Sequence, residues 1–351
     1  MRPKFLLIVA AAAALGVAAA SWALSWPPPR LLLLTPHAHR AACPPLLGAA
    51  ATDIVVYIPS PIPWRARRRQ VLRTMRPDLL DDAHLYFVLG TRAGGPQLER
   101  EAEDLAAARR EAAEEEAADP RVRYLFVACR DLGDMPDDAG GTSSTTCKVY
   151  EALRHIARAY AAAPPRFVWR GADDAHLDLR VFRAHVLPRL QTCRLFLGRI
   201  RFPMPGEDAD LELLPAQPRL YALYGLRKFG KYMVGMGFCM SWDVVRLLGA
   251  GPVPPRLTWA EDVMVGQWLL FYDVDFVDIR QIVGAVGMHH ADQPDELAWL
   301  ATEAPPTYKL LLAHRLSAAQ WRALERRPRG DASARFLLLL PLQGEAAAPP
   351  S

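Results

Sequence analysis

The chain has 351 residues, of which 51% are apolar, so it is long enough for one large or two modest domains with a buried core. Its formal net charge of +4 is too small to indicate a nucleic-acid-binding protein, and no aromatic residues interleave its densest basic run, residues 65–76. We therefore expect that run to be mainly a solvated helix face, with one or two arginines reaching an anionic ligand.

The N-terminus contains an uncharged apolar stretch, residues 5–24, preceded by Arg2 and Lys4. About 20 apolar residues span a bilayer, and preceding positive charges keep that end in the cytoplasm. The pattern predicts a cytoplasmic tail (1–4), a transmembrane signal anchor (5–24) and a lumenal remainder. A cleaved signal peptide is the alternative, because the small residues 18–23 suit signal peptidase.

The proline-rich residues 25–51 are expected to form a stem, followed by a compact domain over residues 52–329 and a tail over 330–351. Within the domain, apolar runs predict strands, and helix-like segments lie between the first four of them. The predicted strands are 53–58, 85–90, 122–128, 166–170 and 194–200, and the helices are 65–75, 98–118 and 146–162. This alternation predicts an α/β fold with a mixed, mostly parallel sheet.

Two adjacent acids, Asp173 and Asp174, follow the fourth predicted strand. In α/β sheets ligands bind at the carboxyl ends of the strands, and paired carboxylates there suit a hard divalent cation that neutralises a phosphate-bearing ligand. The alternative is a helix N-cap, since acids are favoured at the start of a helix. These residues alone leave both interpretations open.

Three further groups follow in the chain. Gly235 and Gly237 precede a helix pattern that starts near Ser241, and close glycines either admit a ligand or turn the chain. A second acidic pair, Glu261 and Asp262, opens a predicted helix and is ambiguous between capping and chemistry. The doublet at residues 289–290 offers two imidazoles, His289 and His290, as candidate metal ligands.

The five cysteines show no spacing typical of a zinc site. An odd number leaves at least one unpaired within the chain. An oxidising compartment permits up to two disulfides, whose pairing the spacing does not reveal, and buried free thiols are the alternative.

Six of these motifs, in order, resemble those of the beta-1,3-galactosyltransferase family, inverting hexosyltransferases that include N-acetylglucosaminyl and Fringe-type relatives. The matching segments are RRRQVLRTM (67–75), YFVLG (86–90), TTCK (145–148), RGADDAHL (170–177), VGMGFCMS (234–241) and EDVMVG (261–266). The chain departs from the family pattern at Leu72, at Met75, and at Ala172, where the family has the first Asp of its acidic triple. The last departure removes a carboxylate that would contact the ribose or the sugar of the donor.

The resemblance implies a GT-A-type nucleotide-sugar-binding domain that uses a UDP-hexose donor and Mn2+. It implies that Asp174 is the direct metal ligand, that His289 or His290 completes the shell, and that Asp173 assists. It also implies that Asp262 is the general base, with Glu261 as the alternative base. Expected donor-binding residues are Asp173, Asp174, Arg68, Lys148, Gly235 and Gly237.

The expected reaction is transfer of galactose in beta-1,3 linkage to a glycan on a glycoprotein, glycolipid or phosphoglycan, by a single-pass type II protein of the Golgi membrane. The alternatives are a beta-1,3-N-acetylglucosaminyltransferase and a catalytically impaired, membrane-tethered glycan-binding relative. A metal-dependent hydrolase is disfavoured because zinc-protease and nuclease spacings are missing, and no nucleic-acid partner is expected.

Overall fold

The computed structural model describes residues 53–79, 83–92, 98–131, 144–201, 231–251, 261–270, 272–282, 286–290 and 309–326. The predicted anchor, the stem and the C-terminal tail lie outside these ranges. None of the helices within the ranges is long and apolar enough to cross a bilayer.

The large sheet contains seven strands in the order β3-β2-β1-β4-β7-β6-β8. These are β1 (Ile54–Pro59), β2 (Ala83–Arg92), β3 (Val122–Arg130), β4 (Phe167–Gly171), β6 (Leu195–Arg201), β7 (Tyr232–Ser241) and β8 (Asp275–Asp278). Only β7 runs antiparallel to its neighbours, so the predicted mixed, mostly parallel sheet is confirmed. The chain order reverses between β1 and β4, which is where open α/β sheets bind ligands.

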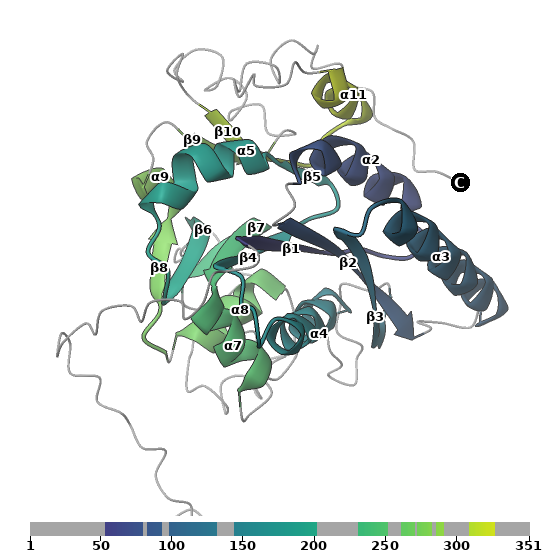
Figure 1. The fold of residues 1–351 in the computed structure, drawn as a ribbon, viewed down its shortest axis with the longest axis horizontal. Coiled ribbons are helices and arrows are strands. Elements are labelled where there is room, and N and C mark those ends of the chain that lie inside the picture. Colours follow the sequence, from purple (N-terminus) through teal and green to yellow (C-terminus); the bar gives the residue numbers. More distant parts are fainter. Residues whose placement is uncertain are drawn as a thin grey trace, which may run out of the picture. The chain divides into compact units, whose positions relative to one another are not determined.

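Helices cover both faces of this sheet (Figure 1). One face carries α2 (Arg65–Met75), η1 (Arg76–Asp78), α3 (Leu98–Ala118), the short helical turns α5 (Leu179–Val181), η2 (Phe182–Val186) and η3 (Leu187–Arg189), and α11 (Ala318–Arg326). The other face carries α4 (Ser144–Ala159), α7 (Trp242–Ala250) and α8 (Glu261–Leu269), and α9 (Ile279–Ile282) follows β8. A second, three-stranded sheet, β5-β10-β9, lies on the α2 side and consists of β5 (Ala175–Leu177), β9 (Val286–His290) and β10 (Lys309–His314).

The central strands are buried on both faces, as parallel strands under two helical layers must be. In β1 the alternation sends Ile54, Val56 and Ile58 into one apolar cluster and Val55 and Tyr57 into the other. The buried residues of α2 recur with the helical period and so form one stripe. Its apolar side chains pack into the first cluster.

The predicted helices at 65–75 and 98–118 are confirmed, and the third begins two residues earlier than predicted. The two glycines Gly235 and Gly237, however, lie inside strand β7 rather than in a turn before a helix. A Cβ on Gly237 would lie 2.8 Å from Leu312 Cδ1 and 3.1 Å from Trp169 Nε1. Gly237 therefore serves the packing of the second sheet against the first.

Cysteines take both forms that the sequence left open. Cys129 at the end of β3 is disulfide-bonded to Cys147 in the first turn of α4. Cys193 is also disulfide-bonded. Cys239 is a free, buried thiol in β7. Disulfides persist mainly in oxidising compartments.

Candidate active site

The reversal between β1 and β4 brings together two side chains that are far apart in sequence. Ser60 follows β1, and its hydroxyl donates a 2.7 Å hydrogen bond to Asp173 Oδ2. Asp173 and Asp174 form the turn between β4 and β5. The N-cap interpretation does not hold for them, because the cap of the next helical turn is Asp178, which accepts the amides of Arg180 and Val181.

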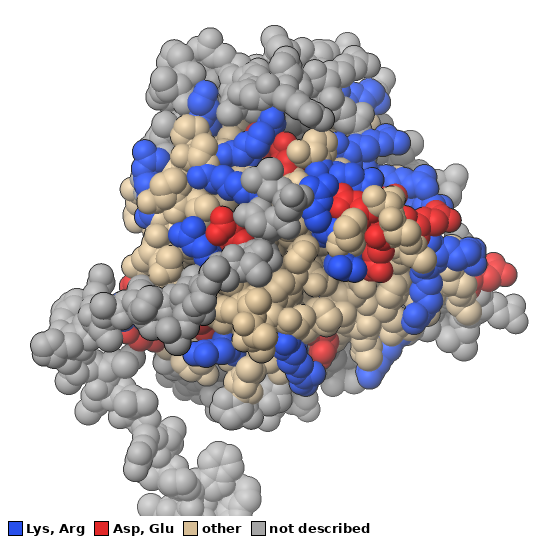
Figure 2. Space-filling model, in the orientation of Figure 1, with Lys and Arg blue, Asp and Glu red and all other residues tan. Residues whose placement is uncertain are grey.

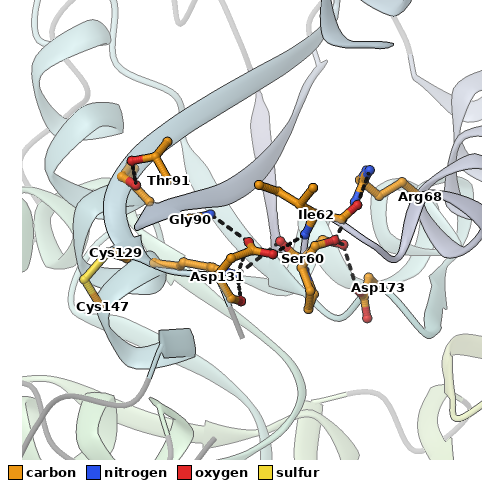
Figure 3. A network of polar contacts seen from close by, with 12 residues as sticks. Ser60, Ile62, Arg68, Gly90, Thr91, Cys129, Asp131, Cys147 and Asp173 are labelled. Atoms are coloured by element: carbon orange, nitrogen blue, oxygen red, sulfur yellow. Dashed lines mark hydrogen bonds and ion pairs between the residues drawn. A yellow bond between two sulfur atoms is a disulfide. The ribbon is translucent and has the colours of Figure 1, made fainter. Parts of the chain in front are cut away.

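A buried polar network fixes the loop that carries Ser60 (Figure 3). Asp131, just after β3, accepts hydrogen bonds from the amides of Ile62 and Gly90, and so joins the ends of three adjacent strands. Lys148 Nζ donates to the carbonyl of Ser60 at 3.2 Å and contacts Asp131 Oδ1 at 3.1 Å. Lys148 was expected to bind the sugar-nucleotide donor. It is only 2% exposed and therefore acts within this network.

Arg68 is likewise part of the framework. It is fully buried, and its guanidinium donates to the carbonyls of Pro61 and Ile62 and to Glu111 Oε2. Its neighbour Arg67 is the arginine that reaches the acidic turn, 3.6 Å from Asp173 Oδ1 and 4.0 Å from Asp174 Oδ2. The exposed Arg67 is thus better placed than Arg68 to meet a bound anion.

Two further arginines of the basic run are paired with acids. Arg65 pairs with Glu111, and Arg76 pairs with Glu115 and Asp119. In Figure 2 red acidic side chains lie among the blue basic ones on the visible face rather than leaving a continuous basic surface. This agrees with a solvated helix face of which one arginine approaches the site.

An imidazole that the sequence analysis missed contacts the acidic turn. His314, the last residue of β10, places Nε2 3.0 Å from Asp174 Oδ1. The contact follows from strand pairing, because β10 runs antiparallel to β5 and sets His314 opposite Ala175, the residue after Asp174. The chain then closes on the same turn, since the amide of Leu316 donates to the carbonyl of Asp174.

The predicted ligands His289 and His290 lie on β9, which pairs in parallel with β10. His289 is in register with Ala313, and His290 with His314. Because neighbours along a strand alternate between faces, His289 belongs to the opposite face of the small sheet from His314. This placement argues against His289 as a metal ligand. The backbone of His290 lies beside His314, and its side chain is outside what the structure describes.

The two acids of the turn are tuned in opposite directions. Burial raises the pKa of Asp173, against the effect of the Ser60 hydrogen bond, and the charge of Asp174 raises it further. Burial also acts to raise the pKa of Asp174, but the His314 hydrogen bond and nearby positive charge outweigh it, so the pKa of Asp174 is lowered. Asp174 is therefore the carboxylate that stays ionised.

The second acidic pair opens α8, beside β7. Glu261 forms an ion pair with Arg170 of β4. Asp262 Oδ2 accepts the Gly235 amide at 2.8 Å, and its Oδ1 accepts the amide of Val263. Gly235, expected to bind the sugar-nucleotide donor, thus fixes the Asp262 side chain through its amide. Burial, with the adjacent charge of Glu261, raises the pKa of Asp262 to about 7.

The donor set at the acidic turn suits a divalent cation. Asp174 and His314 supply a carboxylate oxygen and an imidazole nitrogen on a partly exposed turn, and Mn2+ accepts both ligand types. Within the described ranges no cluster of three or more His, Cys, Asp or Glu residues is arranged to hold a metal. A cation held here by two protein groups would keep positions for other ligands.

No protein-family model and no curated protein matches the chain. Among solved structures, it is similar to the galactosyltransferase LgtC in complex with donor and acceptor sugar analogues, at 14% identity and a TM-score of 0.39, covering 80% of this chain and 93% of that one. A second similar structure is an active-site mutant of LgtC, at 15% identity and a TM-score of 0.36, covering 75% and 87%. Similarity at this level carries no argument about activity, so the function rests on the site.

Proposed function

We propose that the protein is an inverting, metal-assisted glycosyltransferase that moves a hexose from a UDP-sugar to a hydroxyl of a glycan. One observation carries the proposal: two acidic pairs of different character, in the turn after β4 and at the start of α8, share Arg170 as a neighbouring charge. In the first, Asp174 lies partly exposed beside His314 and Arg67, and in the second, Asp262 accepts the amides of Gly235 and Val263. Donor activation and acceptor deprotonation need those two kinds of group.

The first pair supports binding of the donor. Asp174 and His314 would hold a divalent cation, expected to be Mn2+, which when bound would neutralise the charge that grows on the departing UDP. Asp173, fixed by Ser60, closes the inner side of the turn. Arg67, on the first turns of α2 and within 4.0 Å of both carboxylates, would pair with the diphosphate.

Asp262 is the proposed base. In its ionised form it takes the proton of the acceptor hydroxyl as that oxygen attacks the sugar carbon from the side opposite UDP. A base works best when its pKa is close to the working pH, and the raised pKa of Asp262 meets that condition. Glu261 is less suited to the role because Arg170 engages its carboxylate.

The donor sugar is proposed to be galactose and the linkage beta-1,3, with N-acetylglucosamine as the alternative. We also propose that residues 5–24 anchor the protein in the Golgi membrane with this domain in the lumen. The Cys129–Cys147 disulfide supports that location because such bonds persist in oxidising compartments.

The experiment that tests the function uses the purified protein, Mn2+ and a panel of UDP-sugars, with UDP release and transfer to glycan acceptors as readouts. Asp262→Asn should lower transfer by about 10²–10⁴-fold and leave UDP binding intact. Asp174→Asn should abolish metal-dependent UDP binding as well as transfer. Near-normal turnover of Asp262→Asn would show that the base is misassigned.

The same panel addresses the glycan-binding alternative, which rests on Ala172, the residue after β4. A wild-type protein that binds glycans but releases no UDP from any donor is a binding protein, and the enzyme proposal then fails. Ala172→Asp restores the acid expected from the family pattern, so activity gained only in this variant would identify an impaired relative.

A further inference from the structure

Arg170 occupies a position between the two acidic pairs. It is the penultimate residue of β4, in register with Phe238 of β7, and its guanidinium carbon lies 5.9 Å from the centre of the Phe238 ring. Only 5% of the residue is exposed. A cation that is this buried needs compensating negative charge, since its desolvation costs roughly several kcal/mol.

The compensating groups come from both sides of the base. Arg170 donates to the carboxylate of Glu261 and to the carbonyl of Gly235. The amide of the same Gly235 donates to Asp262. One guanidinium therefore holds Glu261 directly and, through Gly235, the strand segment that orients Asp262.

Gly235 leaves no room for the acids to exchange places. A Cβ at this position would lie 3.0 Å from Asp262 Oδ2 and 3.3 Å from Glu261 Oε1. The two carboxylates are thus packed directly against the strand backbone. The arrangement decides the roles: Glu261 is committed to Arg170, and Asp262 accepts the amides of Gly235 and Val263.

We propose that Arg170 is a positioning residue that selects Asp262 rather than Glu261 as the proton acceptor and aligns it with the acidic turn at Asp173 and Asp174. The inference rests on the proposed function and adds a residue that acts through another rather than on the substrate.

The charged groups around Asp262 determine the sign of the test. Its own helix contributes Glu261, β4 contributes Arg170, and β7 contributes the Gly235 amide. Tyr57 of β1 faces Arg170 and Glu261, and α4 packs Tyr150 against Trp268 of α8. The charge of Arg170 lowers the pKa of Asp262, and that of Glu261 raises it. Removing the charge of Arg170 must therefore raise the pKa of Asp262, and removing the charge of Glu261 must lower it.

The experiment compares Arg170→Gln with Glu261→Gln. In Arg170→Gln the acid limb of the pH profile of kcat/KM should move to higher pH by roughly one pH unit. In Glu261→Gln the same limb should move to lower pH by about as much. Arg166→Gln is the matched control, because Arg166 lies beside the other end of the same strand, pairs with Asp53, and should leave the profile unchanged. Loss of kcat in both variants with an unmoved limb would overturn the proposal.

Two further measurements keep the result interpretable. If Arg170→Gln alone does not fold, because Glu261 is left buried and unpaired, the double variant Arg170→Gln/Glu261→Gln restores a neutral pair. Its acid limb should then lie between those of wild type and Glu261→Gln, and a limb identical to that of Glu261→Gln would count against a role for Arg170.

The pH dependence of Tm reports the titration of Asp262 without turnover. If wild type transfers no sugar but the folded Glu261→Gln and Arg170→Gln variants still shift this dependence in opposite directions, the proposed function fails and the electrostatic arrangement stands. If wild type is active but neither the limb nor the Tm dependence moves, the inference fails and the function stands.

Discussion

The two acidic pairs of the site differ in how each is controlled. In the pair after β4, the buried member Asp173 is held by a neutral hydroxyl, and Asp174 is left towards solvent with its pKa lowered. In the pair that opens α8, Glu261 is held by a cation, and Asp262 is left among backbone amides with its pKa raised. Each pair commits one acid to the framework and leaves the other for chemistry.

The comparison shows how adjacent carboxylates acquire different functions without different residue types. A ligand for a cation must be ionised, so Asp174 is next to an imidazole and near Arg67. A base must accept a proton near neutral pH, so Asp262 is half-buried beside a second negative charge. The predictions below remove one controlling group at a time.

The largest expected effect concerns the stability contributed by Asp262. Because its folded pKa is raised to about 7 from an ordinary value of 3.8, the folded state holds its proton more tightly than the unfolded chain. Its contribution to stability is full below about pH 4 and is lost as pH rises through 7, on the order of 2–4 kcal/mol. Asp262→Asn should lack this slope, as thermal unfolding from pH 4 to pH 8 will measure. Parallel curves for the two proteins would contradict the assignment.

The second prediction separates the candidate imidazoles. His314→Ala should weaken Mn2+ binding by at least the roughly 10–100-fold that loss of an outer-shell partner costs. His289→Ala should change it little, since His289 belongs to the other face of the small sheet. Calorimetric titration with Mn2+ and UDP is the measurement. The reverse ranking would return the ligand role to His289.

The third prediction tests the hydroxyl that holds Asp173. Ser60→Ala should reduce the affinity for Mn2+ with UDP by about 10-fold, because the buried carboxylate loses its donor. Ser60→Thr keeps a hydroxyl and should recover most of that affinity. If both variants bind equally weakly, the defect lies in loop packing rather than in the hydrogen bond.

The smallest effect is expected at Arg315, which follows His314 and has a positive φ of 58°. A residue with a Cβ pays roughly 1 kcal/mol there, and glycine does not. Arg315→Gly should leave Mn2+ binding unchanged and keep or slightly raise Tm. A large loss of Tm would mean that the Arg315 side chain itself stabilises the fold.

The first half of the domain was predictable because its elements are local. The helices at 65–75 and 98–118 have clear buried or charged patterns between apolar runs, and the strands that they connect follow. The placement of Asp173 and Asp174 at the carboxyl edge required only the direction of β4. Local pattern was sufficient wherever consecutive elements are also neighbours in space.

The second half depends on pairings between distant segments. Two glycines interrupt the pattern of β7, which hid a central strand. His314 ends an apolar run, a recognisable sign of a strand end, but its contact with Asp174 arises only because β10 pairs with β5. Arg170 likewise gains its role from α8, far along the chain. No periodicity in the sequence encodes these three relations.

The remaining thiol affects how the protein must be produced. Cys239 is fully buried, and burial raises the pKa of its thiol, so the folded protein offers little thiolate for exchange with the Cys129–Cys147 bond. The unfolded chain has no such protection, and its five cysteines compete for partners. Expression in an oxidising host with a disulfide isomerase should therefore yield more native protein than refolding from reduced inclusion bodies.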